Sequence, residues 1–224
     1  FWDGRAPDLK AQAKGPVQAA GEMANTSANA EKMMQSIPAY VSAFRAAFPG
    51  DPNPVTFDNM AKAIEAFEAT LTTPNARFDK FLKGDDTALN DTEKKGLRLF
   101  IDKGCASCHN GINLGGGAYA KFGVVAQPAV EHLPADDQGR FGVTKDIADR
   151  YVFKIPGLRN VELTAPYFHN GSTYDLSKAV SVMGSSQLGV ALSNEETTKI
   201  VAFLKSLTGR QPEVTLPILP PRSR

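Results

Sequence analysis

The sequence of 224 residues has little cysteine and no excess of charge of either sign. It contains 25 Lys and Arg against 24 Asp and Glu, so the basic excess typical of nucleic-acid-binding proteins is missing. No apolar run approaches the roughly 20 residues that a membrane helix needs. Hydrophobic residues make up 42% and charged residues 22%, which is typical of a globular chain. We therefore expect a folded domain or two with no nucleic-acid partner and no membrane span.

The two cysteines stand three residues apart, as Cys105 and Cys108 in GCASCHNG, and His109 follows them. Two thiols at this spacing can add across the vinyl groups of one haem, and the adjacent imidazole can ligate its iron. A redox dithiol would suit a βαβ setting, whereas a helix precedes this pair. A structural zinc site needs four ligands, and only His132 and His169 remain to complete one, at spacings of no common zinc finger. A c-type haem is the favoured interpretation.

Helical patterns dominate the rest of the chain, and we expect an all-α fold with long ordered loops. Two short helices joined near Pro38 are predicted over residues 29–50. An amphipathic helix is predicted over residues 55–74, with Met60, Ile64, Phe67 and Leu71 on one stripe and Pro74 as its end. Residues 110–154 are rich in Gly, Pro and Asp but keep recurring aromatics, which predicts an ordered loop that wraps around something.

Two helices with capping boxes enclose this loop region. One is predicted over residues 88–105, with Asn90 and Glu93 as its box, and it leads directly into the cysteines. Its buried face is expected to hold Leu97, Phe100 and Ile101, with Gly96 allowing a close helix crossing. The other is predicted over residues 192–209, with a box at Ser193 and Glu196, an apolar stripe at Ile200, Phe203, Leu204 and Leu207, and its end at Gly209.

A second axial ligand for the iron is sought on the C-terminal side of the cysteines, where His132, His169 and Met183 are the candidates. Met183 stands in VMGSSQLG, which we expect to be a loop of small residues that lets a thioether reach the iron. Met/His ligation raises the potential of a haem and suits electron transfer. We prefer Met183 over His169, although a methionine taken alone is more often part of a core.

Several stretches together resemble the bacterial di-haem cytochrome c peroxidases, in the order of that family and over essentially the whole chain. They are FWDGRA, QAKGPV with the EM that follows it, TFDNMAKAIEAFEATL, GCASCHNGINLGG, GRFGVTK, LRNVELTAPYFHNG, VMGSSQLG and AFLKSLTG.

The resemblance implies a class I cytochrome c-like haem domain, preceded by the helical remainder of a second cytochrome c-like domain. The implied boundaries are residues 1–73 for the remainder of the peroxidatic domain, 74–210 for the electron-transfer domain, and 211–224 for an extended tail that packs back on the first domain. The sequence has one Cys-x-x-Cys-His, so the first haem motif of the family is expected upstream of Phe1. One covalently bound haem c is expected in this chain and a second in the missing N-terminal part.

The resemblance also implies roles at the electron-transfer haem. Cys105 and Cys108 would hold it covalently, and His109 and Met183 would be its axial ligands. Trp2 would lie between the two haems and help conduct electrons. The alternative is that Trp2 is an ordinary buried tryptophan without a role in electron transfer. Relatives that modify a partner protein use a tyrosine where this sequence has Met183, so the methionine favours an ordinary peroxidase.

Further implied roles concern peroxide and calcium. Glu22 would be the acid/base carboxylate at the peroxidatic haem, and Gln12 would orient the peroxide, although both residues are otherwise plain solvated polar side chains. Backbone carbonyls of Thr164 and Pro166 would ligate calcium. The last two candidates are His169, expected to report the redox state or to be structural, and Arg140, expected to pair with a haem propionate or to be simply exposed.

The implied activity is that of a periplasmic enzyme that reduces hydrogen peroxide to water, with electrons from a small c-type cytochrome or a small copper protein. A homodimer is expected from the family alone. The alternative is a mono-haem electron-transfer cytochrome without peroxidase activity, which explains the single haem motif. It does not explain why the first part of the chain carries FWDGRA and the GEM that contains Glu22.

Overall fold

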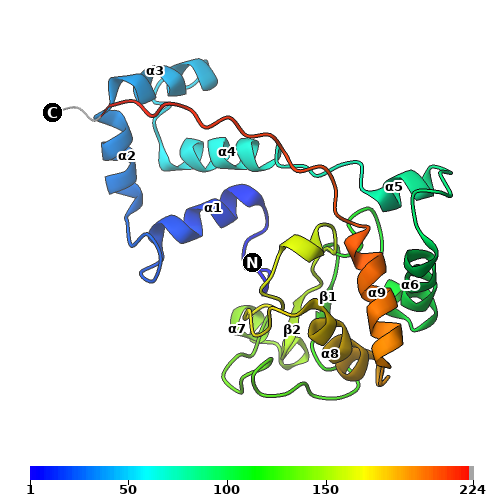
Figure 1. The fold of residues 1–224 in the computed structure, drawn as a ribbon. Coiled ribbons are helices and arrows are strands. Elements are labelled where there is room, and N and C mark those ends of the chain that lie inside the picture. Colours follow the sequence, from blue (N-terminus) through cyan, green and yellow to red (C-terminus); the bar gives the residue numbers. More distant parts are fainter. Residues whose placement is uncertain (222–224) are drawn as a thin grey trace. The chain divides into compact units, whose positions relative to one another are not determined.

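The computed structural model describes residues 1–221, and its ribbon consists mostly of helices joined by long loops (Figure 1). The chain divides into two compact units. Unit 1 contains Phe1–Arg5 and Thr73–Gln211, and unit 2 contains Ala6–Thr72 and the tail that begins at Pro212. The first five residues thus belong with the C-terminal unit, whereas the predicted boundary assigned them to the N-terminal one. The predicted tail, 211–224, lies partly outside the described residues.

Unit 2 holds four helices among its described residues, and the two predicted short helices that meet near Pro38 are confirmed. Proline suits the first turn of a helix, because its missing N–H has no partner there. The predicted helix over 55–74 ends earlier than Pro74, so Leu71 lies beyond it, and Phe67 is half exposed rather than part of a buried stripe. The helices are α1 (Leu9–Gln18), α2 (Ser27–Gln35), α3 (Pro38–Ala47) and α4 (Phe57–Glu68).

Unit 1 surrounds the cysteines with helices, short 3₁₀ turns and one small sheet. Strands β1 and β2 pair antiparallel, with Tyr119 opposite Lys154. This pair and α7 fall within residues 110–154, where only a loop was predicted, but the fold remains mostly helical, as expected. The elements are α5 (Arg77–Leu82), α6 (Asp91–Asp102), η1 (Cys105–Ser107), β1 (Tyr119–Lys121), α7 (Phe141–Thr144), η2 (Ile147–Asp149), β2 (Val152–Lys154), η3 (Val161–Leu163), α8 (Leu176–Leu188) and α9 (Asn194–Lys205).

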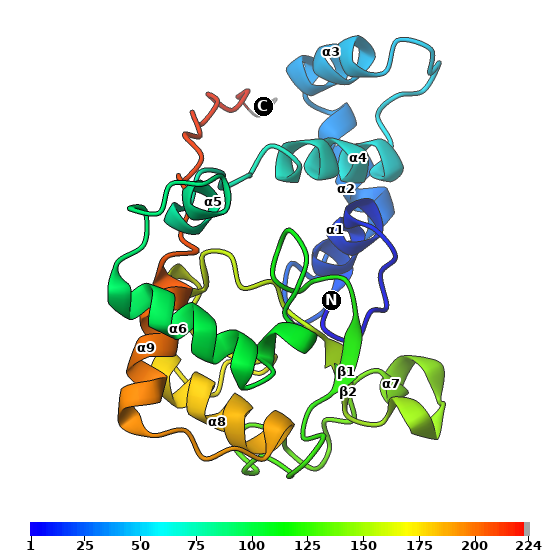
Figure 2. The ribbon, with the colours of Figure 1, turned by 90° about the vertical axis from the view of Figure 1, so that its right-hand side faces the viewer.

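Helices α6 and α9 pack side by side and form the frame of unit 1 (Figures 1 and 2). Both predicted capping boxes are present. Gly96 of α6 faces the backbone of Lys199 in α9, where a side chain would overlap the Lys199 carbonyl, and this confirms the predicted close crossing. Phe100 and Phe203 pack against each other, with ring centroids 5.3 Å apart. Ile101 is 55% exposed, so its predicted place on the buried face is wrong.

The end of α9 differs from its prediction. The helix stops at Lys205 with Ser206 as its C-cap, so Gly209 does not cap it. Gly209 instead lies against the backbone of Thr73, where a Cβ would overlap the Thr73 carbonyl, and its N–H donates to the Asn160 side chain at 2.9 Å. Glycine is therefore required here for a close approach of two chain segments.

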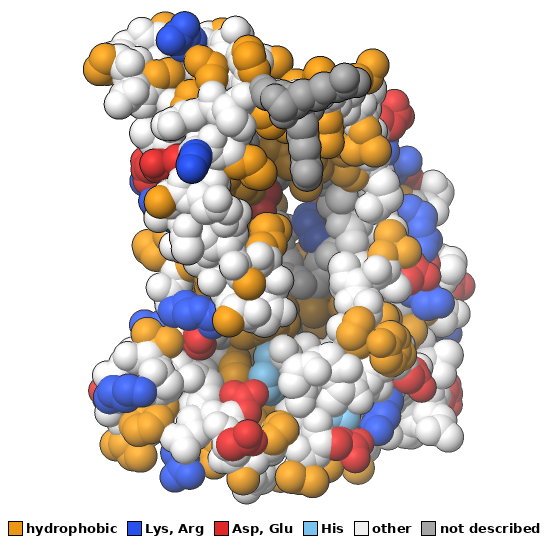
Figure 3. All heavy atoms as spheres, turned by 90° about the vertical axis from the view of Figure 1, so that its left-hand side faces the viewer, with side chains coloured by type: hydrophobic (Ala, Val, Ile, Leu, Met, Phe, Trp, Pro, Cys, Tyr) orange, Lys and Arg blue, Asp and Glu red, His pale blue; other side chains and the backbone are white. Residues whose placement is uncertain are grey.

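On the face shown in Figure 3, basic and acidic side chains are interspersed with apolar ones. This distribution agrees with the formal net charge of +1. Of the helices formed by residues 1–221, none has the length and apolar character that crossing a bilayer requires.

Candidate functional site

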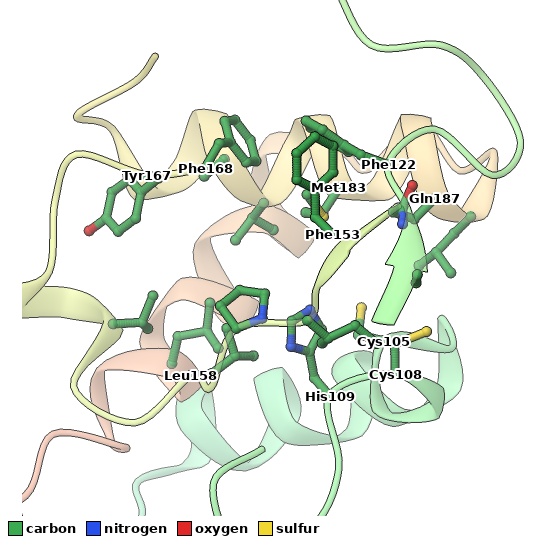
Figure 4. A pocket seen from close by; sticks show the side chains of 18 of the residues that line it. Cys105, Cys108, His109, Phe122, Phe153, Leu158, Tyr167, Phe168, Met183 and Gln187 are labelled. Carbon is green, nitrogen blue, oxygen red and sulfur yellow. The ribbon is translucent and has the colours of Figure 1, made fainter. Parts of the chain in front are cut away.

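An apolar cavity of about 200 Å³ lies inside unit 1, and both cysteines are among the residues that line it. Figure 4 shows Cys105, Cys108 and His109 on one side of it and Met183, Phe122 and Phe153 on the other. The two sides come from different parts of the fold, because the cysteines follow α6 whereas the methionine stands on α8. The lining also includes Trp2, Phe100, Leu158, Tyr167, Phe168, His169, Val180, Gln187 and Leu204.

The imidazole of His109 is oriented by the loop that follows it. Its Nδ1 lies 3.3 Å from the carbonyl oxygen of Leu114, so in the tautomer with a proton on Nδ1 it donates a hydrogen bond there. Nε2 is then left as the ligating nitrogen. Burial lowers the pKa of His109, against the opposing effect of the Leu114 and Pro156 carbonyls. The lowered pKa favours the neutral ring, which is the form that ligates a metal.

The cysteines lack the environment of a reactive redox pair. Cys105 is half buried, Cys108 is exposed, and no disulfide joins them. Burial raises the pKa of the Cys105 thiol, whereas catalytic dithiols depend on a lowered pKa. Residues 1–221 contain no group of three or more His, Cys, Asp or Glu side chains that could hold a metal ion. The two competing interpretations of the motif, a redox dithiol and a zinc site, thus gain no support.

Met183 lies within α8, so the prediction of a loop around it is wrong. It is partly buried and packs against the cluster of Phe122, Leu133 and Phe153. The buried residues of α8 are small ones, Ala179, Gly184 and Ser186, which let the helix approach its neighbours closely. The helix therefore presents the thioether to the cavity on a rigid element, on the side away from His109 (Figure 4).

The other two candidate ligands differ in position. His132 is 2% exposed, does not line the cavity, and pairs through Nδ1 with the Ser172 hydroxyl at 2.7 Å. His169 lines the cavity, but its Nε2 lies 2.7 Å from Asp137 Oδ2 and its ring stacks on Phe153 with centroids 4.0 Å apart. Burial lowers the pKa of His169, and Asp137 opposes this shift. Both histidines thus have partners other than an iron, whereas Met183 faces the cavity.

Trp2 and Arg140 lie in unit 1 with the cavity. The indole of Trp2 lines it and makes an edge contact with His169, with centroids 6.4 Å apart. Arg140 does not line the cavity. Its guanidinium lies over the ring of Tyr119 at 4.7 Å and donates to the carbonyl oxygen of Asp3 at 3.2 Å. The propionate contact of Arg140 stays a prediction, and the structure gives its guanidinium other partners.

Gln12 and Glu22 lie in unit 2. Gln12 stands on α1, and Glu22 is exposed in the turn that follows this helix. The turn folds back on α1, because Met23 N–H donates to the Pro16 carbonyl at 3.2 Å and Glu22 N–H to the Ala19 carbonyl at 3.0 Å. Their roles toward peroxide stay predictions.

Thr164 and Pro166 stand on an exposed segment directly after η3. Calcium accepts carbonyl oxygens together with waters, so exposed carbonyls are a suitable donor type, but two of them make up only part of the six to eight oxygens that calcium takes. The calcium site therefore stays a prediction.

Several residues that line the cavity were not predicted from the sequence. Gln187 joins α8 to the end of β1, because its Oε1 accepts from Gly123 N–H at 2.6 Å and its Nε2 donates to the Lys121 carbonyl at 3.0 Å. Phe122 and Phe153 come from two segments, far apart in the sequence, that are joined by the β1–β2 pair. The recurring aromatics of residues 110–154 were a signal that this stretch packs around something, without showing which rings face inward.

The cavity and its lining suit a covalently attached haem. Two thiols at the required spacing and an imidazole with Nδ1 engaged stand on one side, and a soft thioether ligand stands on the other. The remaining walls are aromatic and aliphatic, which matches the apolar faces of a porphyrin.

Comparisons with known proteins agree with this site. A family model described as di-haem cytochrome c peroxidase matches residues 1–87, and one described as cytochrome c matches residues 93–208. A cytochrome c551 peroxidase of Pseudomonas aeruginosa is 57% identical, over 98% of this chain and 64% of its own length. A cytochrome c551 peroxidase of Nitrosomonas europaea is 51% identical, over 99% of this chain and 65% of its own length. The crystal structure of a MauG-like protein associated with microbial copper homeostasis has a TM-score of 0.76 at 27% identity, over 90% of this chain and 69% of its own.

The chain therefore spans just under two thirds of the length of these two curated relatives. The di-haem peroxidase match begins at residue 1, so it gives no support to the expectation that the first haem domain is lacking. The cofactor expected from both family models is haem c, in agreement with the cavity at Cys105, Cys108 and His109. The chain belongs to the di-haem cytochrome c peroxidase family.

Proposed function

We propose that this chain forms the electron-accepting part of a periplasmic peroxidase that reduces hydrogen peroxide to water. The observation that supports this most is the apolar cavity that places Cys105, Cys108 and His109 opposite Met183. The step from electron transfer to peroxide reduction rests on the relatives, which are named cytochrome c551 peroxidase.

The residues of the cavity hold and tune the cofactor. Cys105 and Cys108 would attach haem c through thioether bonds, and His109 Nε2 and the Met183 sulfur would hold its iron. The bound haem supplies an iron that accepts and releases one electron at a time. The thioether of Met183 would raise the potential of a haem bound there, compared with a second histidine. The Leu114 carbonyl keeps His109 in one tautomer and one orientation.

The overall reaction consumes two electrons and two protons for each hydrogen peroxide and yields two water molecules. Two molecules of a one-electron donor each lose one electron. We propose a small c-type cytochrome or a small copper protein as this donor. The periplasm, the usual compartment of proteins with thioether-bound haem, is the proposed location, and a homodimer is the proposed assembly.

Unit 2 is proposed to serve the peroxide chemistry, next to the second haem of the family. The carboxylate of Glu22 would take a proton from one oxygen of hydrogen peroxide and return it to the oxygen that leaves as water. Glu22 is exposed on the turn after α1, so its carboxylate is in contact with solvent. The side-chain amide of Gln12, on α1, would orient the peroxide by hydrogen bonding.

Trp2 is proposed to conduct electrons away from the cavity, because its indole lines it and contacts His169. His169, held by Asp137 and stacked on Phe153, is proposed to respond to the redox state of the cavity. The exposed carbonyls of Thr164 and Pro166 are proposed to contribute to a calcium site.

The alternative is a mono-haem electron-transfer cytochrome without peroxidase activity. The observation that favours it is the single Cys-x-x-Cys-His in the sequence. In such a carrier Glu22 has no catalytic role, so removing its carboxylate should not change electron transfer.

Glu22→Gln decides between the two functions. The full-length protein that contains this chain, loaded with haem, is mixed with a reduced small c-type cytochrome and hydrogen peroxide, and oxidation of the donor is followed by absorbance. The peroxidase requires that Glu22→Gln lose roughly 10²-fold or more in rate, the contribution of a general acid–base group, while the spectrum of the His109 haem is unchanged. Asp86→Asn, which alters an exposed carboxylate between α5 and α6, is the control and should keep full activity. Equal rates in the wild type and Glu22→Gln would favour the carrier.

A further inference from the structure

The first four residues form a tight turn that is bound to the small sheet of unit 1. The N–H of Gly4 donates to the carbonyl oxygen of Phe1 at 3.1 Å and closes the turn. The carbonyl oxygen of Trp2 accepts from the N–H of Lys154, the last residue of β2, at 2.7 Å. The backbone of Trp2 is thereby attached to the strand whose central residue, Phe153, lines the cavity.

Gly4 allows this turn to lie close to the sheet for two reasons. Its φ is +72°, which is the left-handed region that side chains with a Cβ rarely adopt. A Cβ on Gly4 would also overlap the hydroxyl of Tyr119 and would approach Arg140 Nη1 to 2.5 Å. Any larger residue must therefore move the turn or both of these side chains.

Arg140 connects the turn to three other parts of unit 1. Its Nη1 donates to the carbonyl oxygen of Asp3 at 3.2 Å, and its Nε lies 3.4 Å from the Asp149 carboxylate. Its guanidinium lies over the ring of Tyr119 on β1, and its own N–H donates to the Val152 carbonyl at 2.8 Å. The side chain is 29% exposed, so these contacts are partly shielded from water.

The indole of Trp2 extends from this turn to the wall of the cavity. It remains 38% exposed, and its ring meets the ring of His169 at 70° with centroids 6.4 Å apart. His169 in turn stacks on Phe153. A shift of the turn would therefore move the indole relative to His169 and the cavity wall.

We propose that Gly4 and Arg140 are positioning residues that hold the indole of Trp2 at the wall of the cavity. Arg140 acts through the Asp3 carbonyl and the Tyr119 ring, and Gly4 acts by leaving room for both. This inference rests on the proposed role of Trp2 in electron transfer, and it gives Arg140 a function that does not involve a haem propionate.

Trp2 is the one tryptophan of the 224 residues, so fluorescence reports its position directly. The test compares the wild type with Gly4→Ala, Arg140→Ala and the milder Arg140→Lys, all in the haem-loaded form. Gly84→Ala is the matched control, because Gly84 has a φ of +99° but nothing within 4 Å of an added Cβ. It imposes the same kind of backbone strain without a collision. Fluorescence lifetime and accessibility to acrylamide measure the indole, and turnover with peroxide measures electron delivery.

We expect Gly4→Ala and Arg140→Ala to change the lifetime and to raise the accessibility of the indole. Turnover should fall roughly ten- to a hundredfold, the range that a misplacement of about 1 Å can cost, while reduction of the His109 haem by the donor is unchanged. Arg140→Lys should show a smaller change, and Gly84→Ala none.

An unchanged indole in Gly4→Ala and Arg140→Ala would overturn the proposal. An indole that moves while turnover is retained would support the positioning role and refute the proposed role of Trp2 in electron transfer. If Gly4→Ala fails to bind haem or to fold, the two Arg140 variants decide the matter alone.

Discussion

Replacing Gly96 with alanine would place a methyl group where α6 and α9 cross. The added Cβ would overlap the Lys199 carbonyl and would come within 2.9 Å of the Cβ of Phe203, whose side chain is completely buried. Overpacking of this kind costs about 1–3 kcal/mol, and the upper end applies because the obstacle includes backbone. Alanine recovers about 1 kcal/mol through its better helix propensity. The net expectation is a loss of about 2 kcal/mol.

The assay is guanidinium or thermal unfolding of the haem-loaded protein, followed by circular dichroism. A loss of this size lowers the midpoint temperature by roughly 4–8 °C for a chain of this length. Gly142→Ala in α7 is the control, because a Cβ there has nothing within 4 Å. If Gly96→Ala were as stable as the wild type or more stable, the helix propensity term would dominate. The close crossing of α6 and α9 would then not be what limits this position.

Three further predictions follow from the site and its frame. Met183→His should lower the midpoint potential of the haem, because bis-histidine ligation favours the oxidised iron. Spectroelectrochemistry measures this potential, and an unchanged value would mean that Met183 is not a ligand. Burial lowers the pKa of His169 below its ordinary 6.5, so as pH falls the unfolded chain takes up this proton first. Stability is therefore complete above about pH 6.5 and decreases as pH falls toward the folded-state pKa, and His169→Phe should flatten that slope in unfolding experiments. Glu93→Ala should lower the free energy of unfolding by about 2 kcal/mol, because it removes the hydrogen bond to the Asn90 N–H and the ion pair with Arg77. Chemical unfolding measures this change, and a loss below half of that value would show that water replaces both contacts.

The helices that frame the site could be predicted because their signals are local. Asn90 with Glu93 and Ser193 with Glu196 are pairs three residues apart, and each forms the expected capping box. The haem motif is local as well, since it needs only Cys105, Cys108 and His109 in sequence. Gly96 was found from its place on the buried side of α6.

Other parts depend on contacts between distant residues and could not be predicted in this way. Helix α8 buries only small residues, Ala179, Gly184 and Ser186, and its larger apolar residues Leu176, Val180 and Met183 face the cavity, so the run of small and polar residues after Met183 resembled a loop. Strands β1 and β2 have three residues each and exist only because residues 119–121 pair with 152–154. The position of Trp2 beside His169 depends on that same sheet.

The covalent attachment of haem at Cys105 and Cys108 is the central claim, and intact-mass spectrometry of the denatured protein tests it most directly. The protein is produced in cells that carry out c-type haem attachment, with a Cys105→Ser/Cys108→Ser double variant as the control. We predict that the 24.0 kDa polypeptide gains the mass of one haem, and that the variant gains none. A denatured wild-type protein with the mass of the bare polypeptide and two thiols free to alkylate would contradict the account.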